Sequence, residues 1–188
     1  PRVVYEAGPC GYAIYRHLTK NGYPCKVIAP SLTPKKAGDR IKNDTRDATT
    51  LARLERSGDL TEICVTTEED EAMRDLTRAR QDAVKTQTMA RQQLKSFLLR
   101  HDKRCPSSES WGTTHMQWLK GVSMDLPVLQ IVLDDYIHTV IAATDRVKEL
   151  EAAIARAIPE WRLAPYVRSL QAMRGIAAVS AATMVAET

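Results

Sequence analysis

Residues 67–104 read TEEDEAMRDLTRARQDAVKTQTMARQQLKSFLLRHDKR, a stretch that contains neither glycine nor proline. Thr67 and the acidic residues after it form a capping-box pattern, and negative side chains suit the positive end of a helix dipole. We therefore predict one helix of about 35 residues, about 50 Å long at 1.5 Å per residue. Its positions at alternating steps of three and four form a heptad seam with three polar breaks: Met73, Leu76, Arg80, Ala83, Gln87, Ala90, Leu94, Phe97 and His101.

A second long helix is predicted to begin at Pro127 and to end before Pro159. A breaker-rich stretch, Cys105 to Gly112, and a short amphipathic piece separate it from the first helix. Two long helices joined by a structured loop predict a long antiparallel helical coiled-coil hairpin over residues 67–160. The second helix carries apolar residues at helical spacing: Leu129, Val132, Leu133, Tyr136, Val140, Val147, Leu150 and Ile154.

The first 66 residues have an α/β pattern, so the predicted fold class is α/β plus all-α. A strand at Arg2–Glu6, a helix at Tyr12–Thr19 and a strand at Cys25–Ala29 fit a parallel β-α-β unit. A helix is expected from Asp44 to Ser57, and a third strand from Leu60 to Val65.

Residues 161–188 are expected to be helical on both sides of Gly175, and Leu170–Ala181 resembles a helix-hairpin-helix. In that motif the glycine turn lets backbone N–H groups approach a phosphate at a helix N-terminus. A generic turn between two helices explains the same residues.

Composition excludes several classes of protein. Of the 188 residues, 44% are hydrophobic and 27% are charged, which is typical of a globular protein, and no run is long enough for a membrane helix. Four cysteines without a C-x-x-C pair argue against a zinc site or a disulfide scaffold and indicate a reducing cytoplasm. Aromatic residues are only 5%, which argues against a base-stacking platform.

Charge is unevenly distributed along the chain, whose net charge is +4. Residues 74–104 carry nine basic and three acidic side chains, whereas residues 127–160 carry three basic and six acidic ones. The two helices could pair with each other, or the first could face a polyanion, and both alternatives stay open. On the first helix, the candidates for contact with nucleic acid are Arg78, Arg91 and Lys95.

A second basic cluster lies in the N-terminal region, where five positive charges fall within twelve residues. Beside a metal site they would receive a phosphate backbone, whereas a basic loop standing alone is more often simply solvated. The five residues are Lys35, Lys36, Arg40, Lys42 and Arg46.

Three carboxylates are candidates for a metal site. Glu6 closes the first predicted strand, and Asp44 and Asp47, three residues apart, project from one face of a helix start. Carboxylate oxygens suit Mg²⁺, and two-metal phosphoryl transfer needs such a cluster. The alternative is ordinary helix capping by the aspartates and a solvated glutamate.

Several sequence blocks occur together in a specific order. YEAGPCGY at residues 5–12, VIAPSL at residues 27–32 and KNDTRDA at residues 42–48 come first. With the later pieces they resemble the DEDD transposases of the insertion-sequence one-ten family, now described as bridge-RNA-guided recombinases, over essentially the whole chain. The later pieces are Leu76–Arg80, Phe97–His101, Trp118-Leu119 and Leu170–Glu187.

The resemblance implies a RuvC-like, RNase H-type domain, partial here over residues 1–66, then a coiled-coil insertion that assembles subunits. Residues 161–188 would begin a C-terminal transposase domain with a nucleophilic serine. Carried over by motif, Glu6 is the second acidic residue of the set, and Asp44 and Asp47 are the third and fourth. They would bind Mg²⁺ beside the DNA strand to be cut, while a structured guide RNA would supply the choice of sequence.

Two parts of the family pattern fall outside this chain. The first Asp of the set lies upstream of the YEAGPCGY block, and the serine is expected after residue 188. We therefore expect an internal piece of a DNA-associated transposase of the bacterial cytoplasm, which by itself does not recombine DNA. The alternative function is a catalytically inert coiled-coil oligomerisation module.

Overall fold

The computed structural model describes residues 2–33, 44–106 and 111–188. The chain divides into two compact units, Pro1–Thr67 and Glu68–Thr188. Within the described ranges, no helix combines the length and the apolar character needed to cross a membrane.

The N-terminal unit contains the predicted β-α-β arrangement. Strand β1 (Val3–Glu6) pairs in parallel with β2 (Cys25–Ile28), and helix α1 (Ala13–Lys20) connects them. The helix ends where Gly22 adopts a φ of 78°, and the next N–H, that of Tyr23, donates to the Leu18 carbonyl at 3.0 Å. This turn, which glycine adopts without strain, sends the chain back to the sheet.

The expected third strand at Leu60–Val65 is wrong. The described residues form a two-stranded sheet, and this segment contributes one antiparallel bridge between Ile28 and Glu62. The Ile63 N–H donates to the Val27 carbonyl at 2.9 Å. Alternating side chains make a segment suitable for a strand, but a strand also needs a continuous ladder of backbone partners. Here the ladder is limited to this one bridge.

Helix α2 (Asp44–Ser57) has the predicted bounds and packs against β1. Leu51 and Leu54 lie half-buried on one side of the helix, whereas the residues of its first turns from Thr45 onward are exposed. The amphipathic face therefore lies in the second half of α2.

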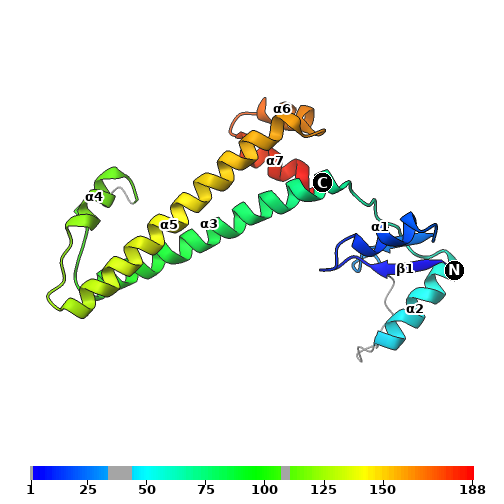
Figure 1. Cartoon of the computed structure of the whole chain (residues 1–188), viewed down its shortest axis with the longest axis horizontal. Coiled ribbons are helices and arrows are strands. Elements are labelled where there is room, and N and C mark those ends of the chain that lie inside the picture. Colours follow the sequence, from blue (N-terminus) through cyan, green and yellow to red (C-terminus); the bar gives the residue numbers. More distant parts are fainter. Residues whose placement is uncertain (1, 34–43, 107–110) are drawn as a thin grey trace. The chain divides into compact units, whose positions relative to one another are not determined.

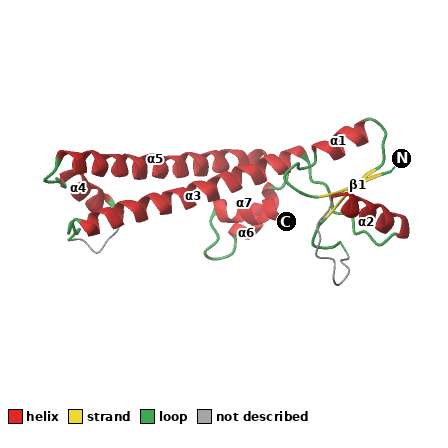
Figure 2. Ribbon diagram, turned by 90° about the horizontal axis from the view of Figure 1, so that it is seen from below, coloured by secondary structure: helices red, strands yellow, loops and turns green. Residues whose placement is uncertain are grey.

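In the second unit, α3 (Glu68–Arg100) and α5 (Pro127–Ala157) lie side by side in antiparallel directions (Figures 1 and 2). Met73 shares a buried cluster with Ile154 near one end, and Leu94 shares another with Leu133 near the other end. The two long helices were predicted from their periodicity, and both are confirmed.

Two of the three polar breaks in the seam of α3, Arg80 and Gln87, have hydrogen-bond partners on α5. The Arg80 Nε donates to Glu151 Oε1 at 3.1 Å, and the Gln87 Nε2 donates to Thr144 Oγ1 at 3.1 Å. These pairs lie between the two apolar clusters, so they continue the contact where the heptad pattern is interrupted.

Helix α3 ends at Arg100, four residues before the predicted end. Asp102 adopts a φ of 51°, in the left-handed region, and the Lys103 N–H donates to the Leu98 carbonyl at 2.9 Å. This is the hydrogen bond of a Schellman motif, with aspartate at the position that glycine usually occupies. No glycine or proline marks this end, which is why the composition of the stretch did not reveal it.

Shorter helices complete the unit: α4 (Thr113–Gly121), the 3₁₀ helix η1 (Ile158–Glu160), α6 (Ala164–Gln171) and α7 (Ala178–Glu187). Gly175, with a φ of 90°, lies in the turn between α6 and α7, so the chain is helical on both sides of it, as predicted. Trp161, Val167 and Ala181 pack in the same cluster as Met73, so residues 161–188 share a core with α3 and α5. Phosphate contact at this turn stays a prediction.

Candidate functional site

Glu6 lies at the end of β1, with its side chain exposed. Directly after it, the Ala7 N–H donates to the Ile28 carbonyl at 2.8 Å, so the pairing with β2 holds this end of the strand. The Thr33 Oγ1 lies 3.5 Å from Glu6 Oε1, which makes a long and weak hydrogen bond. The sheet therefore fixes the backbone of Glu6 and leaves its carboxylate open to solvent.

The other two predicted carboxylates lie at the start of α2. Asp44 is the first residue of the helix, and its side chain lies outside the described part of the structure. Asp47, one turn later, is exposed. Among the described residues, no three acidic, histidine or cysteine side chains gather into a metal-binding group. The metal role of the three carboxylates therefore stays a prediction.

The opposite end of α2 is anchored to both strands through Glu55. The Arg2 Nη1 donates to Glu55 Oε1 at 3.1 Å, and the Lys26 Nζ donates to Oε2 at 3.2 Å. From Glu55 the helix extends about 12 Å back to Asp47, and the chain extends about 13 Å from Arg2, just before β1, to Glu6 at its end. The two lengths are similar. Figure 1 shows that α2 is inclined to β1, however, so the equal lengths do not by themselves bring Asp47 beside Glu6.

Lowering the pH is expected to weaken the N-terminal unit through Glu55. Hydrogen bonds from Lys26 and then Arg2 lower the pKa of the Glu55 carboxyl below its ordinary value. This interaction stabilises the fold above the unfolded-state pKa of about 4.3, and the stabilisation is lost as the pH falls through the lower folded-state pKa.

Glu55→Gln should therefore remove about 1 kcal/mol near neutral pH, because its partners are partly exposed, and should flatten the loss of stability toward acid. Hydrogen exchange of the β1 and β2 amides across the acid range measures both effects. Identical pH dependence in the variant and the original protein would contradict this role for Glu55.

The donor set has the chemistry that a hard divalent cation requires. Carboxylate oxygens are ligands that Mg²⁺ prefers. Glu6 and Asp47 are exposed, and neither forms an ion pair within the described part of the chain. Asp44 would add a third carboxylate from the helix face that carries Asp47. These residues fit a Mg²⁺ site by donor type.

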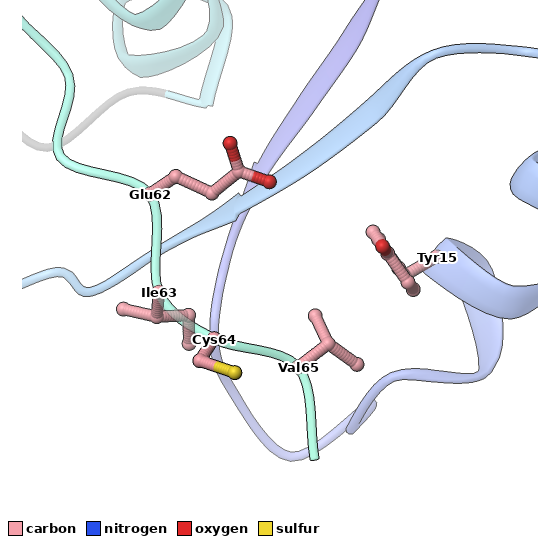
Figure 3. A pocket seen from close by; sticks show the side chains of 5 residues that line it. All are labelled: Tyr15, Glu62, Ile63, Cys64 and Val65. Atoms are coloured by element: carbon pink, nitrogen blue, oxygen red, sulfur yellow. The ribbon is translucent and has the colours of Figure 1, made fainter. Parts of the chain in front are cut away.

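An open pocket of about 440 Å³ lies elsewhere in the N-terminal unit (Figure 3). It is lined by Tyr15 of α1 and by Glu62, Ile63, Cys64 and Val65. Figure 3 shows the Tyr15 ring across the opening from the Val65 side chain, with the Glu62 carboxylate at another edge. Its lining includes one carboxylate and none of the predicted site residues, so it does not coincide with the candidate metal site.

The basic residues of the N-terminal cluster are mostly beyond the described structure. Lys35, Lys36, Arg40 and Lys42 lie outside the described residues. Arg46 lies on the first turn of α2, beside Asp47, with its side chain exposed. It is therefore available to a phosphate next to the candidate metal ligands.

Arg78, on α3, is engaged inside the helical unit. Its Nε donates to Glu187 Oε1 at 2.7 Å and its Nη2 donates to Oε2 at 2.8 Å. This paired hydrogen bond is the main reason that the pKa of Glu187 is lowered. Nucleic-acid contact by Arg78 would have to compete with Glu187.

Arg91 and Lys95 lie one turn apart on α3, in the region that α4 covers. The Arg91 guanidinium carbon lies 5.2 Å from the centre of the Trp111 ring, in a cation–π contact, and burial lowers the pKa of this arginine. Lys95 is exposed. Pairing of basic α3 with acidic α5, one of the two alternatives left open by the sequence, is seen between Arg80 and Glu151. Arg91 and Lys95 form no ion pair with α5 within the described residues.

Three residues beside these cations were not identified from the sequence. Trp111, His115 and Trp118 have spacings of four and three, but Trp111, with a φ of 69°, precedes α4, whereas His115 and Trp118 lie on it. The His115 ring lies 4.9 Å from the Trp111 ring and 5.6 Å from the Trp118 ring, centre to centre. The spacing was the available signal, but nothing local showed that α4 would bring these rings to Arg91.

Known relatives of the chain are transposases. The putative transposase y4qE of Sinorhizobium fredii (strain NBRC 101917 / NGR234) is 43% identical over 183 residues, which cover 97% of this chain and 44% of that protein. The transposase for insertion sequence element IS1533 of Leptospira borgpetersenii is 35% identical over 185 residues, covering 97% of this chain and 54% of the relative. The chain thus spans about half the length of these curated relatives. No solved structure matches it significantly.

Residues 2–101 match the transposase family of the DEDD, IS110 type. This range includes the N-terminal unit and all of α3. The chain belongs to the IS110-type DEDD transposases, which confirms the resemblance found in the motif blocks.

Proposed function

We propose that this chain is part of a DNA transposase that moves an insertion sequence by metal-assisted strand cleavage and transfer, in the bacterial cytoplasm. The observation that carries the proposal is the position of the family's acidic residues. Glu6 ends a strand, and Asp44 and Asp47 start a helix that packs on that strand. Family membership supports the catalytic reading of these carboxylates over simple helix capping.

Glu6, Asp44 and Asp47 would hold Mg²⁺ through their carboxylate oxygens. The ion would supply charge neutralisation at the phosphate and a more acidic attacking oxygen. Within the chain, the pairing of Ala7 with Ile28 keeps Glu6 in place, and the anchor at Glu55 sets the direction of α2.

One exposed cation beside Asp47, and further basic residues close to it in the sequence, support binding of a nucleic-acid backbone. Arg46 is exposed beside Asp47, and the basic residues from Lys35 to Lys42 precede it in the chain. Such contacts position nucleic acid without reading its sequence. We propose that the partners are DNA and a structured guide RNA, with the RNA supplying the choice of target.

Asp47→Ala is expected to abolish strand cleavage by the longer transposase that contains this chain. The side chain is exposed, so the change in the free energy of unfolding should stay within about 0.5 kcal/mol. Loss of a metal ligand removes stabilisation made in the transition state, so the rate of cleavage should fall by at least about a hundredfold. Cleavage of a labelled substrate at several Mg²⁺ concentrations measures this effect.

Asp59→Ala is the matched control, because Asp59 is also an exposed aspartate and lies just past the end of α2. It should cleave like the unmodified protein. Cleavage by Asp47→Ala at the control rate would rule out the metal role of Asp47.

A second candidate function is assembly of copies through the helical unit. Leu99, Val128 and Ile131 are between 62% and 70% exposed, although they are large and apolar. Such residues favour contact with another protein surface. We propose that α3 and α5 form a homo-oligomer in coiled-coil fashion. Sedimentation equilibrium over a range of protein concentrations tests this proposal. A monomer at every concentration would exclude assembly by this chain alone.

A further inference from the structure

Five residues form a cluster where α4 packs against α3: Arg91, Lys95, Trp111, His115 and Trp118, here called the Trp–His cluster. The Arg91 guanidinium lies over the Trp111 ring, and the His115 ring lies between the two tryptophans in sequence and in contact distance of both. The Trp111 and His115 rings meet edge to face, with an interplanar angle of 68°. Two indoles, an imidazole and the Arg91 guanidinium are therefore gathered in one place, and Lys95, one turn along α3 from Arg91, is close enough for its charge to lower the pKa of His115.

The cluster has two unpaired polar atoms, and among the described residues no carboxylate forms an ion pair with it. His115 is only 9% exposed, and its Nδ1 is buried without a hydrogen-bond partner in the described part of the protein. The Nε of Arg91 is also buried and has no hydrogen-bond partner in the described part of the protein. Burial lowers the pKa of Arg91, and burial followed by the charge of Lys95 lowers the pKa of His115. No described carboxylate contributes to either pKa.

Packing against the buried cluster around Leu94 accounts for the two indoles, but a purely structural role does not account for the polar groups placed among them. A buried polar group without a partner destabilises a fold by about 1–3 kcal/mol. A cation near a buried imidazole adds repulsion whenever the ring is protonated. Apolar residues such as Leu119 and Leu94, which pack next to the cluster, would fill the same space without these costs. An anion bound at the cluster would compensate both cations.

We propose that the Trp–His cluster binds one phosphodiester and an adjacent base of a single-stranded nucleic acid. Lys95 and Arg91 contact the phosphate, and Trp111 and Trp118 offer aromatic surface to the base. Both tryptophans are only partly buried. Stacking of a base on an aromatic side chain and ionic contact with its phosphate are the two interactions by which proteins hold single strands. His115 positions the two indoles and takes up a proton more readily when a phosphate is near.

This site rests on the proposed binding of nucleic acid and specifies one place where it occurs. The low aromatic content argued against a base-stacking platform, and over the whole chain that argument holds. The fold nevertheless brings two of the three tryptophans together beside Arg91 and Lys95, which form no ion pair within the described residues. Local concentration of these groups matters for binding, and average composition does not report it.

The test is titration of the whole chain with ten-nucleotide oligouridylate and, separately, oligothymidylate, followed by fluorescence anisotropy at several salt concentrations. Lys95→Gln should lower the slope of log affinity against log salt by about one, because one phosphate contact is lost. Trp111→Leu should weaken binding by about fivefold or more, and Trp111→Phe should retain most of the affinity. The two oligomers distinguish RNA from DNA as the source of the strand.

Lys85→Gln is the matched control, since it removes the same charge from the same helix at an exposed position. It should leave binding and its salt dependence near those of the unmodified chain. Circular dichroism verifies folding of each variant, and the exposed Lys95 keeps the test valid even where Trp111→Leu unfolds. As a second readout, proton NMR should show the pKa of His115 rising when the oligonucleotide is added.

The outcomes separate this inference from the proposed function. Binding that is equal in Lys95→Gln, Trp111→Leu and Lys85→Gln, with an unmoved pKa for His115, overturns the site while nucleic-acid binding stands. Absence of binding by the unmodified chain at low salt overturns the site and the proposed binding of nucleic acid by this chain, whereas the proposed strand cleavage is tested separately through Asp47.

Discussion

Leu94→Asp is expected to unfold the helical unit. Leu94 is completely buried, in a cluster with Phe97, Leu119 and Leu133 where α3, α4 and α5 meet. Even Leu→Ala at a buried site destabilises by about 2–5 kcal/mol. An aspartate there would also be desolvated without a cation to pair with, which adds several kcal/mol. The sum approaches the whole stability of an ordinary domain, about 5–15 kcal/mol.

Far-ultraviolet circular dichroism and urea unfolding measure this effect. The matched control is Met89→Asp, because Met89 lies on the same helix and is 55% exposed. The control should keep its helicity and its unfolding midpoint. If Leu94→Asp has the helicity and midpoint of the control, then the contact between the long helices is not as the structure describes it.

Asp70→Ala is expected to detach the C-terminal helices from the start of α3. Asp70 is 3% exposed, and its Oδ1 accepts a hydrogen bond from the Trp161 indole Nε1 at 2.9 Å. Its carboxylate also forms an ion pair with Arg162, whose Nε lies 3.1 Å from each oxygen. Removing the carboxylate leaves a buried indole N–H without an acceptor and Arg162 without its partner. We expect a loss of about 3 kcal/mol.

Trp161 fluorescence and urea unfolding report on this region. Asp75→Ala is the control, since Asp75 is exposed on the same helix, and it should change the free energy of unfolding by less than about 0.5 kcal/mol. Arg162→Ala should have a smaller effect than Asp70→Ala, because the Arg162 side chain is 52% exposed. Equal stability of Asp70→Ala and Asp75→Ala would show that the buried carboxylate does not hold these helices.

The helices of this protein were predictable to within a few residues because their signals are local. Periodicity along α3 and α5 identified both helices, and the bounds of α2 were predicted correctly from Asp44 and Gly58. The end of α3 was misplaced, because Asp102 takes the left-handed conformation that glycine usually marks. The third strand was predicted wrongly for another reason. A strand forms only with a paired neighbour, and here the pairing with β2 is a single bridge, at Ile28.

In the candidate site, too, the local positions of the residues were predictable from the sequence, whereas the arrangement of the elements was not. The sequence placed Glu6 at a strand end and Asp44 and Asp47 at a helix start, and the structure confirms these local positions. It did not indicate how α2 would be inclined to β1, which depends on the anchor between Glu55, Arg2 and Lys26. The roles of the three carboxylates stay predictions that rest on the family.

By itself, the sequence determined the two long helices, the parallel β-α-β unit and membership of the transposase family, because neighbours within one helical turn or one motif carry that information. Only the tertiary structure decided which cations are already engaged. Arg78 and Arg91 look alike in sequence, yet Arg78 binds Glu187, 109 residues away, and Arg91 lies against Trp111. Such partners come together when apolar faces pack. A buried polar group then needs a partner among the residues that packing has brought near it, and these can lie far away in the sequence.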